Sequence, residues 1–227
     1  MRPLVWLPFD PAELGDPPSS FAYEVVDPTD SVPDSVGQVE IYVPPYAVGP
    51  AVADVIGQMT SLRYVQALTA GVDNLRSAIP PGVTLCSGRG IHDTSTAELV
   101  LTLVLASLRG VPSFVRAQDR HEWTPGWHPA LADRTVLLVG YGAIGAAIEA
   151  RLVPFECTVV RVARSARDGV HPISELPSLL PENYLIAATG MWPFCGAIAL
   201  ARAEGKPLYF LPFFLTAPRA TRFCNFS

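Results

Sequence analysis

Charge is scarce in this sequence. Charged residues make up 16% of the 227 residues, against roughly 25% in an average soluble domain. The formal net charge is −5, so the chain lacks the basic excess on which sequence-independent nucleic-acid binding relies. We therefore expect no nucleic-acid partner.

Cysteine motifs are also missing. Cys86, Cys157, Cys195 and Cys224 include no C-x-x-C pair, which argues against a zinc ribbon or a disulfide framework. Isolated cysteines suit a reducing cytosol. The first nine residues hold one basic residue and too short an apolar run for a signal peptide. We expect a cytoplasmic protein, and no metal site, because the four histidines form no metal-ligand pair either.

No long apolar run is free of helix breakers. Residues 183–201 are 19 residues without a charge, close to the roughly 20 that a membrane-spanning helix needs. This stretch contains Gly190, Pro193 and Gly196, and no basic cluster adjoins it. We expect no membrane partner.

The first 90 residues alternate short β-rich runs with turn-rich and helical segments. With 49% apolar residues the chain can build a real core. A helix is expected over residues 49–59, where Val52, Val55, Ile56 and Met59 have helical spacing. Strands are expected over residues 5–9, 21–26, 39–43, 62–68 and 83–86. This alternation predicts an α/β fold with a mostly parallel sheet.

A nearly all-apolar helix is expected over residues 97–108, capped at its start by Thr94, Ser95 or Thr96. Residues 116–133 are polar and aromatic and contain prolines and glycines. We interpret them as a linker.

The strongest motif follows this linker. An apolar strand over residues 135–139 leads directly into Gly140-Tyr141-Gly142-Ala143-Ile144-Gly145. Ile144, Ile148 and Leu152 then fall on one helix face.

A strand, a G-x-G-x-x-G loop and a helix in this order are typical of dinucleotide binding. The first glycine permits the tight turn, the second lets the backbone approach a pyrophosphate, and the third allows close packing. The N–H groups that begin the helix, around Tyr141, Gly142, Ala143 and Ile144, then face the anion. The alternative is a glycine-rich turn without a ligand.

The residues at the end of the second strand indicate the cofactor. An acidic residue about 20 positions past the glycines would bind the ribose 2′-hydroxyl. This sequence instead has Arg164 and Ser165, followed by Arg167. Guanidinium and hydroxyl groups can bind a 2′-phosphate that a carboxylate would repel. We therefore expect NADP, with NAD as the second choice; a solvated basic loop is the alternative.

Three segments in this order resemble the D-isomer-specific 2-hydroxyacid dehydrogenases, the family of phosphoglycerate, glyoxylate and hydroxypyruvate reductases. They are residues 64–74 (YVQALTAGVDN), the apolar helix that begins at Ala97-Glu98, and the glycine loop. The resemblance covers roughly residues 5–180.

The resemblance implies a flavodoxin-like substrate domain over residues 1–105 and an incomplete Rossmann domain over residues 106–181. Residues 182–227 would then be an atypical tail. It further implies NAD(P)H-dependent interconversion of a small 2-oxo acid and a D-2-hydroxy acid, and a homodimer formed through the cofactor domain.

The resemblance also assigns residues around the substrate. The backbone N–H groups of Ala70, Gly71 and Val72 would hold the substrate carboxylate; a simple turn glycine is the alternative. Thr96 matches a position near the nicotinamide, and helix capping explains it equally well.

The family's catalytic residues have no recognisable counterpart. In the family a histidine supported by a carboxylate protonates the substrate oxygen, and an arginine holds the carboxylate and carbonyl groups. After residue 181 we find neither the family's next strand nor these residues, and none of the four histidines has an acidic partner at a telling spacing. The catalytic residues therefore stay unassigned.

Loss or alteration of the family's catalytic end by truncation or a shifted reading frame would explain this pattern. We expect an impaired dehydrogenase, and a non-catalytic dinucleotide-binding protein is the alternative.

Overall fold

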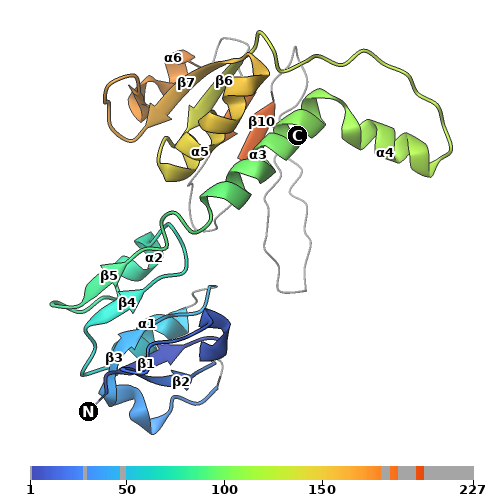
Figure 1. Cartoon of the computed structure of the whole chain (residues 1–227). Helices are drawn as coiled ribbons and strands as arrows, with labels where there is room; N and C mark the ends of the chain where they lie inside the picture. Colours follow the sequence, from blue (N-terminus) through green and yellow to red (C-terminus); the bar gives the residue numbers. More distant parts are fainter. Residues whose placement is uncertain (1, 28–29, 47–49, 180–184, 189–197, 202–227) are drawn as a thin grey trace. The chain divides into compact units, whose positions relative to one another are not determined.

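The computed structural model describes residues 2–27, 30–46, 50–179, 185–188 and 198–201 (Figure 1). The chain divides into two compact units, Met1–Ser95 and Thr96–Ser227. Each unit has its own sheet. We describe each unit by itself.

The first unit is built on a parallel sheet of five short strands. The strands are β1 (Leu4–Leu7), β2 (Ala22–Val25), β3 (Val39–Tyr42), β4 (Tyr64–Gln66) and β5 (Thr84–Cys86). Helices α1 (Pro50–Ile56) and α2 (Asp73–Arg76) and the 3₁₀ turns η1 (Pro11–Leu14) and η2 (Asp34–Gln38) connect them. The strand order is β2-β1-β3-β4-β5, which is the flavodoxin-like order. The predicted fold class of this unit is confirmed.

The core of the first unit lies on both faces of the sheet. The central strand β1 reads Leu-Val-Trp-Leu, and a strand buried on both faces needs such a continuous apolar run. Trp6 is fully buried and packs with Val52 and Ile56 of α1, whereas Val5 and Leu7 pack in a separate cluster. This alternation follows from the period of two along a strand.

The second unit also has a five-stranded sheet. Its strands are β6 (Thr135–Val139), β7 (Thr158–Ala163), β8 (His171–Pro172), β9 (Leu185–Ala188) and β10 (Ile198–Ala201). Its helices are α3 (Asp93–Leu108, which begins at the end of the first unit), α4 (Val111–Asp119), α5 (Ala143–Leu152) and α6 (Leu176–Leu179), with 3₁₀ turns η3 (Val153–Phe155) and η4 (Ile173–Glu175).

The strand order of this sheet is β10-β9-β6-β7-β8. Strands β8, β7, β6 and β9 run parallel, and β10 runs antiparallel to β9. The parallel part has the order 3-2-1-4 of a Rossmann sheet.

Both faces of β6 are covered. One face, with Val136 and Leu138, packs against α5 and against one side of α3. Leu137 points to the other face, where it packs with Val162 of β7 and with α6. The apolar stripe of α3 that reaches this core consists of Ala97, Val100, Val104 and Leu108.

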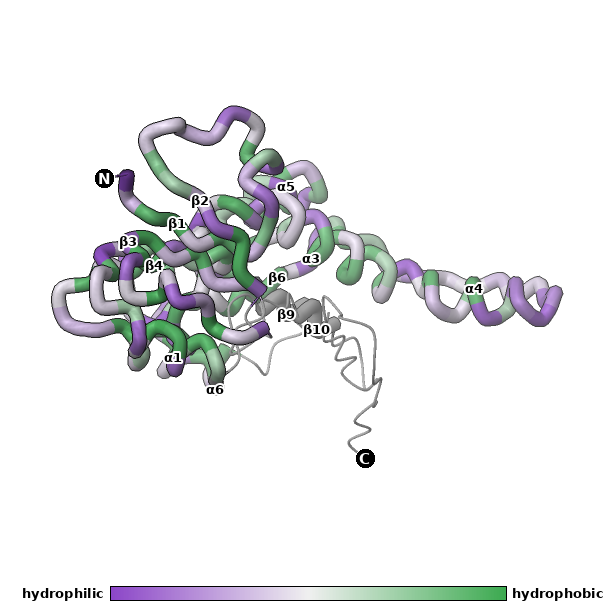
Figure 2. Tube along the Cα trace, turned by 90° about the horizontal axis from the view of Figure 1, so that it is seen from below, coloured by the Kyte–Doolittle hydropathy of each residue, from purple (hydrophilic) through white to green (hydrophobic). Residues whose placement is uncertain are grey.

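Two predictions about helix boundaries are wrong. Residues 116–119 are not part of a linker, because α4 extends from Val111 to Asp119. Figure 2 shows that hydrophobic and hydrophilic residues alternate along this helix. Gly110 takes a left-handed conformation, with φ of 67°, and ends the preceding helix. Pro112 then lies in the first turn of α4, where a missing N–H group costs nothing. Thr94, Ser95 and Thr96 do not cap α3, because the helix already begins at Asp93.

The expectation that no further family strand follows residue 181 is also wrong. β9 pairs in parallel with β6 from Val136↔Leu185 to Val139↔Ala188. Its sequence, Leu-Ile-Ala-Ala, is a short apolar run of the kind that a central parallel strand requires. Residues 182–184, 189–197 and 202–227 of the tail lie outside the described residues.

In the described part of the chain, no single helix is long and apolar enough to cross a membrane. Helices α3 and α4 pass that test only when counted together, and they are bent by 68° at the break between them.

Candidate functional site

The three glycines of the loop between β6 and α5 have the geometry that the sequence predicts, whereas the Tyr141 N–H, which the sequence places toward the anion, donates to the Val162 carbonyl at 3.1 Å. Gly140 has φ of 106°, a value that residues with a side chain rarely adopt. A Cβ atom on Gly145 would lie 2.6 Å from the carbonyl oxygen of Gly140, so the helix packs against the loop without room for a side chain. A Cβ atom on Gly142 would meet nothing within 4 Å. Gly140 thus permits the turn, Gly142 leaves space for a ligand to approach the backbone, and Gly145 allows α5 to pack closely against the loop.

The amino end of α5 faces this open space. Gly142 is the N-cap residue, and among the described residues no side chain caps the first N–H groups of α5. The first turn of any helix has N–H groups without intrahelical partners, and the helix dipole adds positive charge there. The loop is therefore able to bind an anion such as a pyrophosphate.

A cluster of charged and aromatic side chains surrounds Tyr141. The Tyr141 hydroxyl donates to Oε2 of Glu149 at 2.5 Å, and Nε of Arg161 donates to the same oxygen at 2.8 Å. A second contact joins Nη2 of Arg161 to Oε1 of Glu149. The guanidinium groups of Arg161 and Arg167 lie 5.5 and 5.8 Å from the centre of the Tyr141 ring.

This cluster shifts the acidity of its members. Hydrogen bonds from Arg161 hold the pKa of the Glu149 carboxyl below its ordinary value, and the carboxylate in turn raises the pKa of Arg161. The hydrogen bond to Glu149 raises the pKa of the Tyr141 hydroxyl. Glu149 is therefore ionised and Tyr141 neutral at physiological pH. The hydrogen bond between them holds the Tyr141 side chain, which follows the first glycine of the loop, in place.

Arg164 and Ser165 follow directly after β7 and are exposed. The next arginine, Arg167, contacts the glycine loop, because its guanidinium donates to the backbone carbonyl of Tyr141. A tight turn fixes this arginine, with hydrogen bonds in both directions between Arg167 and Val170. The structure thus brings the loop after β7 next to the glycine loop.

The segment Ala70-Gly71-Val72 forms a partly exposed loop between β4 and α2. None of its three N–H groups donates a hydrogen bond to any of the residues that the structure describes. Its Gly71 has open space around the Cα atom. A short stretch of backbone with unpaired N–H groups is a suitable anion-binding nest.

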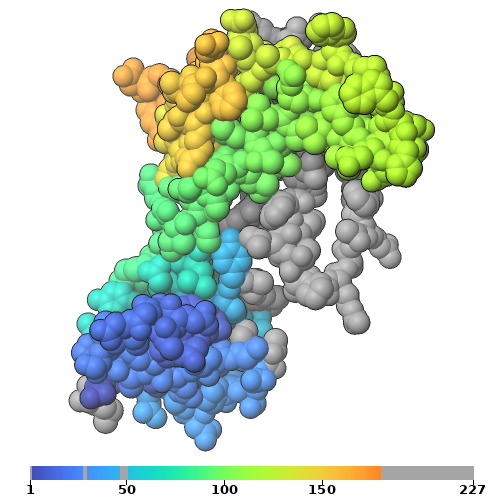
Figure 3. All heavy atoms as spheres, turned by 45° about the vertical axis from the view of Figure 1, so that its right-hand side comes forward, coloured from blue at the N-terminus to red at the C-terminus, as the bar shows by residue number. Residues whose placement is uncertain are grey.

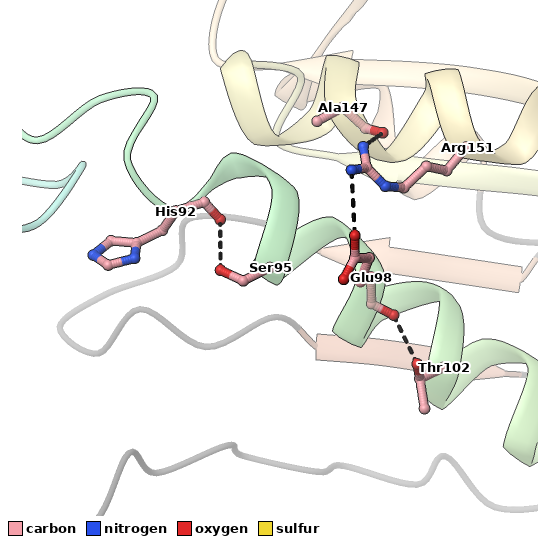
Figure 4. A network of polar contacts seen from close by, with 6 residues as sticks. All are labelled: His92, Ser95, Glu98, Thr102, Ala147 and Arg151. Atoms are coloured by element: carbon pink, nitrogen blue, oxygen red, sulfur yellow. Dashed lines mark hydrogen bonds and ion pairs between the residues drawn. The ribbon is translucent and has the colours of Figure 1, made fainter.

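Thr96 lies in the first turn of α3 and is partly exposed. It makes no capping contact among the described residues. Figure 4 shows what stabilises this part of the helix: Glu98 forms an ion pair with Arg151 of α5 at 3.6 Å, and Thr102 donates to the Glu98 carbonyl at 2.8 Å.

Two histidines have partners that the sequence analysis missed. Nδ1 of His171 lies 2.8 Å from Oε2 of Glu175, although both side chains are about half exposed. The signal for this pair was present as i,i+4 spacing. Nε2 of His92 lies 3.2 Å from the carbonyl oxygen of Leu68, a contact over 24 positions that no local pattern indicates. No group of three or more His, Cys, Asp or Glu in the described part of the chain could hold a metal ion.

The strand order of the second unit and its glycine loop are typical of dinucleotide-binding α/β proteins, and a flavodoxin-like unit precedes them in the chain. Residues 101–185 match the model of the D-isomer specific 2-hydroxyacid dehydrogenase NAD binding domain. The resemblance to this family is confirmed, and the matched segment is similar to the family's NAD binding domain.

Two relatives with similar sequences have names that fit this family. The glyoxylate reductase/hydroxypyruvate reductase of Mus musculus is 33% identical over 103 residues, which are 42% of this chain and 31% of that protein. A D-specific alpha-keto acid dehydrogenase of Enterococcus faecium is 36% identical over 121 residues, 51% of this chain and 37% of that protein. The matched part of the chain thus spans about a third of these relatives.

Solved structures show the same fold. An NADPH-dependent glyoxylate/hydroxypyruvate reductase from Sinorhizobium meliloti, in complex with NADP and sulfate, superposes with a TM-score of 0.65 at 24% identity. The match covers 85% of this chain and 63% of that one. A D-isomer specific 2-hydroxyacid dehydrogenase from Xanthobacter autotrophicus Py2, in complex with NADPH and MES, gives 0.66 at 23% identity, with 84% and 64% covered.

Proposed function

We propose that the second unit binds NADP(H) at the glycine loop and that the first unit binds the carboxylate of a small 2-oxo acid at residues 70–72. The observation that carries the proposal is the contrast between Gly142, with open space where a Cβ would be, and Gly145, with none. A loop evolved only for packing has no reason to leave its second glycine and the helix end uncovered.

The bound nicotinamide would supply the hydride that reduces the 2-oxo group. Backbone N–H groups around Gly142, Ala143 and Ile144 hold the pyrophosphate, and Tyr141 fixes the loop through Glu149. Thr96 remains a candidate for the nicotinamide end. The substrate class follows from the family match, because relatives are named as reductases of glyoxylate and hydroxypyruvate.

Preference for NADP rests on the loop after β7. Arg164 and Ser165 are exposed beside a glycine loop that Arg167 already contacts, and no carboxylate occupies the first positions after β7. A guanidinium binds a phosphate through charge-assisted hydrogen bonds. The neighbours solved with NADP or NADPH fit this proposal.

Self-association is a further part of the proposal. Val111, Phe114 and Val115 share one side of α4 and are 44%, 40% and 50% exposed. Figure 3 shows the yellow-green segment that contains α4 at the surface of the second unit. Adjacent exposed apolar side chains favour association, in line with the homodimer that the family resemblance implies.

Calorimetric titration of the full chain with NADPH and NADH tests the cofactor assignment. We expect NADPH to bind more tightly, and Arg164→Asp to weaken NADPH binding roughly tenfold, because a favourable charge contact becomes a repulsion. Arg2→Asp, at an exposed position before β1, makes the same change of charge and serves as the control. Equal affinities for both cofactors, unchanged in Arg164→Asp, would contradict the NADP preference.

A further inference from the structure

Three chain segments with polar or aromatic groups follow adjacent strands of the first sheet. Tyr46 comes after β3, the loop of residues 69–72 after β4, and His92 after β5. These strands are parallel neighbours in the order β3-β4-β5. Parallel strands place their carboxyl ends at one edge of the sheet, which is where α/β proteins bind ligands.

His92 is held in one orientation at this edge. Its Nε2 atom lies 3.2 Å from the Leu68 carbonyl oxygen, and since a carbonyl only accepts hydrogen bonds, Nε2 carries the proton. The ring also meets the Tyr46 ring edge to face, with centroids 5.5 Å apart and an interplanar angle of 84°. Its own backbone carbonyl accepts from Oγ of Ser95 at 3.3 Å (Figure 4).

In the loop that follows Leu68, carbonyl groups take part in hydrogen bonds within the protein. The carbonyl of Leu68 accepts from His92, that of Thr69 accepts from the Gly88 N–H at 2.8 Å, and that of Gly71 accepts from Oγ1 of Thr69 at 2.6 Å. A Cβ on Gly88 would lie 2.9 Å from the Leu68 carbonyl, so the two loops are in tight contact.

The N–H groups of Ala70, Gly71 and Val72, by contrast, have no acceptor among the described residues. Engaged carbonyls and unpaired N–H groups are the arrangement that favours an anion over a cation or a neutral ligand.

We infer that His92 is a positioning residue for this anion-binding loop. By donating to the Leu68 carbonyl, its Nε2–H holds the peptide unit from which the loop starts. Without the donor, the Leu68 carbonyl would turn toward another partner or water, and the following N–H groups would no longer be held in place for an anion. The inference rests on the proposed function, in which this loop binds the carboxylate of a 2-oxo acid.

Titration of the full chain with oxalate, followed by the backbone amide signals of the loop, tests this role. His92→Leu removes the donor, His92→Gln retains an N–H donor, and His171→Leu changes a half-exposed histidine elsewhere. We expect His92→Leu to weaken oxalate binding roughly tenfold, with His92→Gln and His171→Leu within about threefold of wild type. Rescue by glutamine separates positioning from general loss of structure.

A second measurement is independent of any ligand. Nitrogen-15 spectra of the wild-type imidazole, at a pH at which the ring is neutral, are expected to show His92 protonated at Nε2. Protonation at Nδ1 instead, or wild-type oxalate affinity in His92→Leu, would overturn the inference and leave the proposed function intact. Failure of the wild-type chain to bind oxalate would overturn the anion loop itself, while the spectra would still decide the His92–Leu68 contact.

Discussion

Glu149 joins two side chains beside the glycine loop. It is the common acceptor for Tyr141 and Arg161, and Arg161 and Arg167 lie on the Tyr141 ring. Its side chain is only 14% exposed, whereas that of Arg161 is 35% exposed. Removing the carboxylate charge would therefore leave the partly solvated Arg161 guanidinium without its counter-charge and give the Tyr141 hydroxyl a weaker, uncharged acceptor.

We expect Glu149→Gln to lower the free energy of unfolding by about 1–2 kcal/mol at pH 7, at the lower end for a charged hydrogen bond because water reaches Arg161. Since the folded-state pKa of Glu149 is lowered, its contribution is fully present above the unfolded value of about 4.3 and is lost as pH falls through the lower folded value. Urea unfolding of both proteins between pH 7 and pH 3 measures this.

The difference between wild type and Glu149→Gln should accordingly shrink below about pH 4. Tyr141→Phe is the matched control: it removes one hydroxyl, keeps the ion pair, and should cost about 1 kcal/mol. A difference between wild type and Glu149→Gln that is constant across this pH range would contradict the ionised role of Glu149.

Some of the individual side-chain contacts could be predicted from spacing in the sequence, and others could not. His171 and Glu175 have i,i+4 spacing, so their contact could have been inferred. Tyr141 precedes α5 and is eight positions from Glu149, beyond the spacing at which helical side chains are neighbours. Arg161 comes from another strand, and the contact of His92 with Leu68 joins segments 24 positions apart. Such contacts depend on strand order, which short motifs do not specify.

At the scale of elements, two glycines of one motif should respond in opposite ways to the same substitution. Gly142→Ala adds a methyl group to open space at the approach to α5, so it should cost less than about 1 kcal/mol of stability. The methyl group would occupy the space assigned to the pyrophosphate, and NADPH affinity should fall roughly tenfold.

Gly145→Ala places its methyl group 2.6 Å from the Gly140 carbonyl, so α5 must move, and we expect a loss of about 2 kcal/mol or more. Thermal unfolding and calorimetric titration of both variants measure the two effects. Unchanged NADPH binding in Gly142→Ala, at wild-type stability, would remove the loop from the cofactor site.

Sequence patterns predict some of the helices and strands well and miss others. The strands of the first unit and the unit β6–loop–α5–β7 are confirmed, because apolar runs bounded by turn residues mark the strands and apolar residues at helical spacing mark α5. The end of α4 was assigned to the linker because residues 116–119 adjoin a polar and aromatic segment with prolines and glycines. β9 was missed because four apolar residues among prolines and glycines carry no periodicity of their own, and only pairing with β6 reveals the strand.

At the scale of the whole molecule, the reduction of a 2-oxo acid requires a general acid as well as hydride transfer. Among the described residues, the histidine paired with a carboxylate is His171, and both members of the His171–Glu175 pair are about half exposed. His92 is oriented by a backbone carbonyl and a tyrosine ring instead. The described residues therefore provide groups that can bind a cofactor and a substrate, but they do not provide a buried histidine–carboxylate pair for proton transfer.

We expect the chain to bind NADPH but to reduce glyoxylate and hydroxypyruvate slowly, because a positioned general acid contributes about 10²–10⁴-fold. Oxidation of NADPH followed by absorbance, beside a calorimetric binding measurement on the same preparation, separates binding from turnover. Rapid turnover would show that an acid is in place. His92→Gln and His171→Gln would then identify it, because the variant without the acid should lose most of its kcat while it retains NADPH affinity. Binding without turnover would instead favour a non-catalytic dinucleotide-binding role.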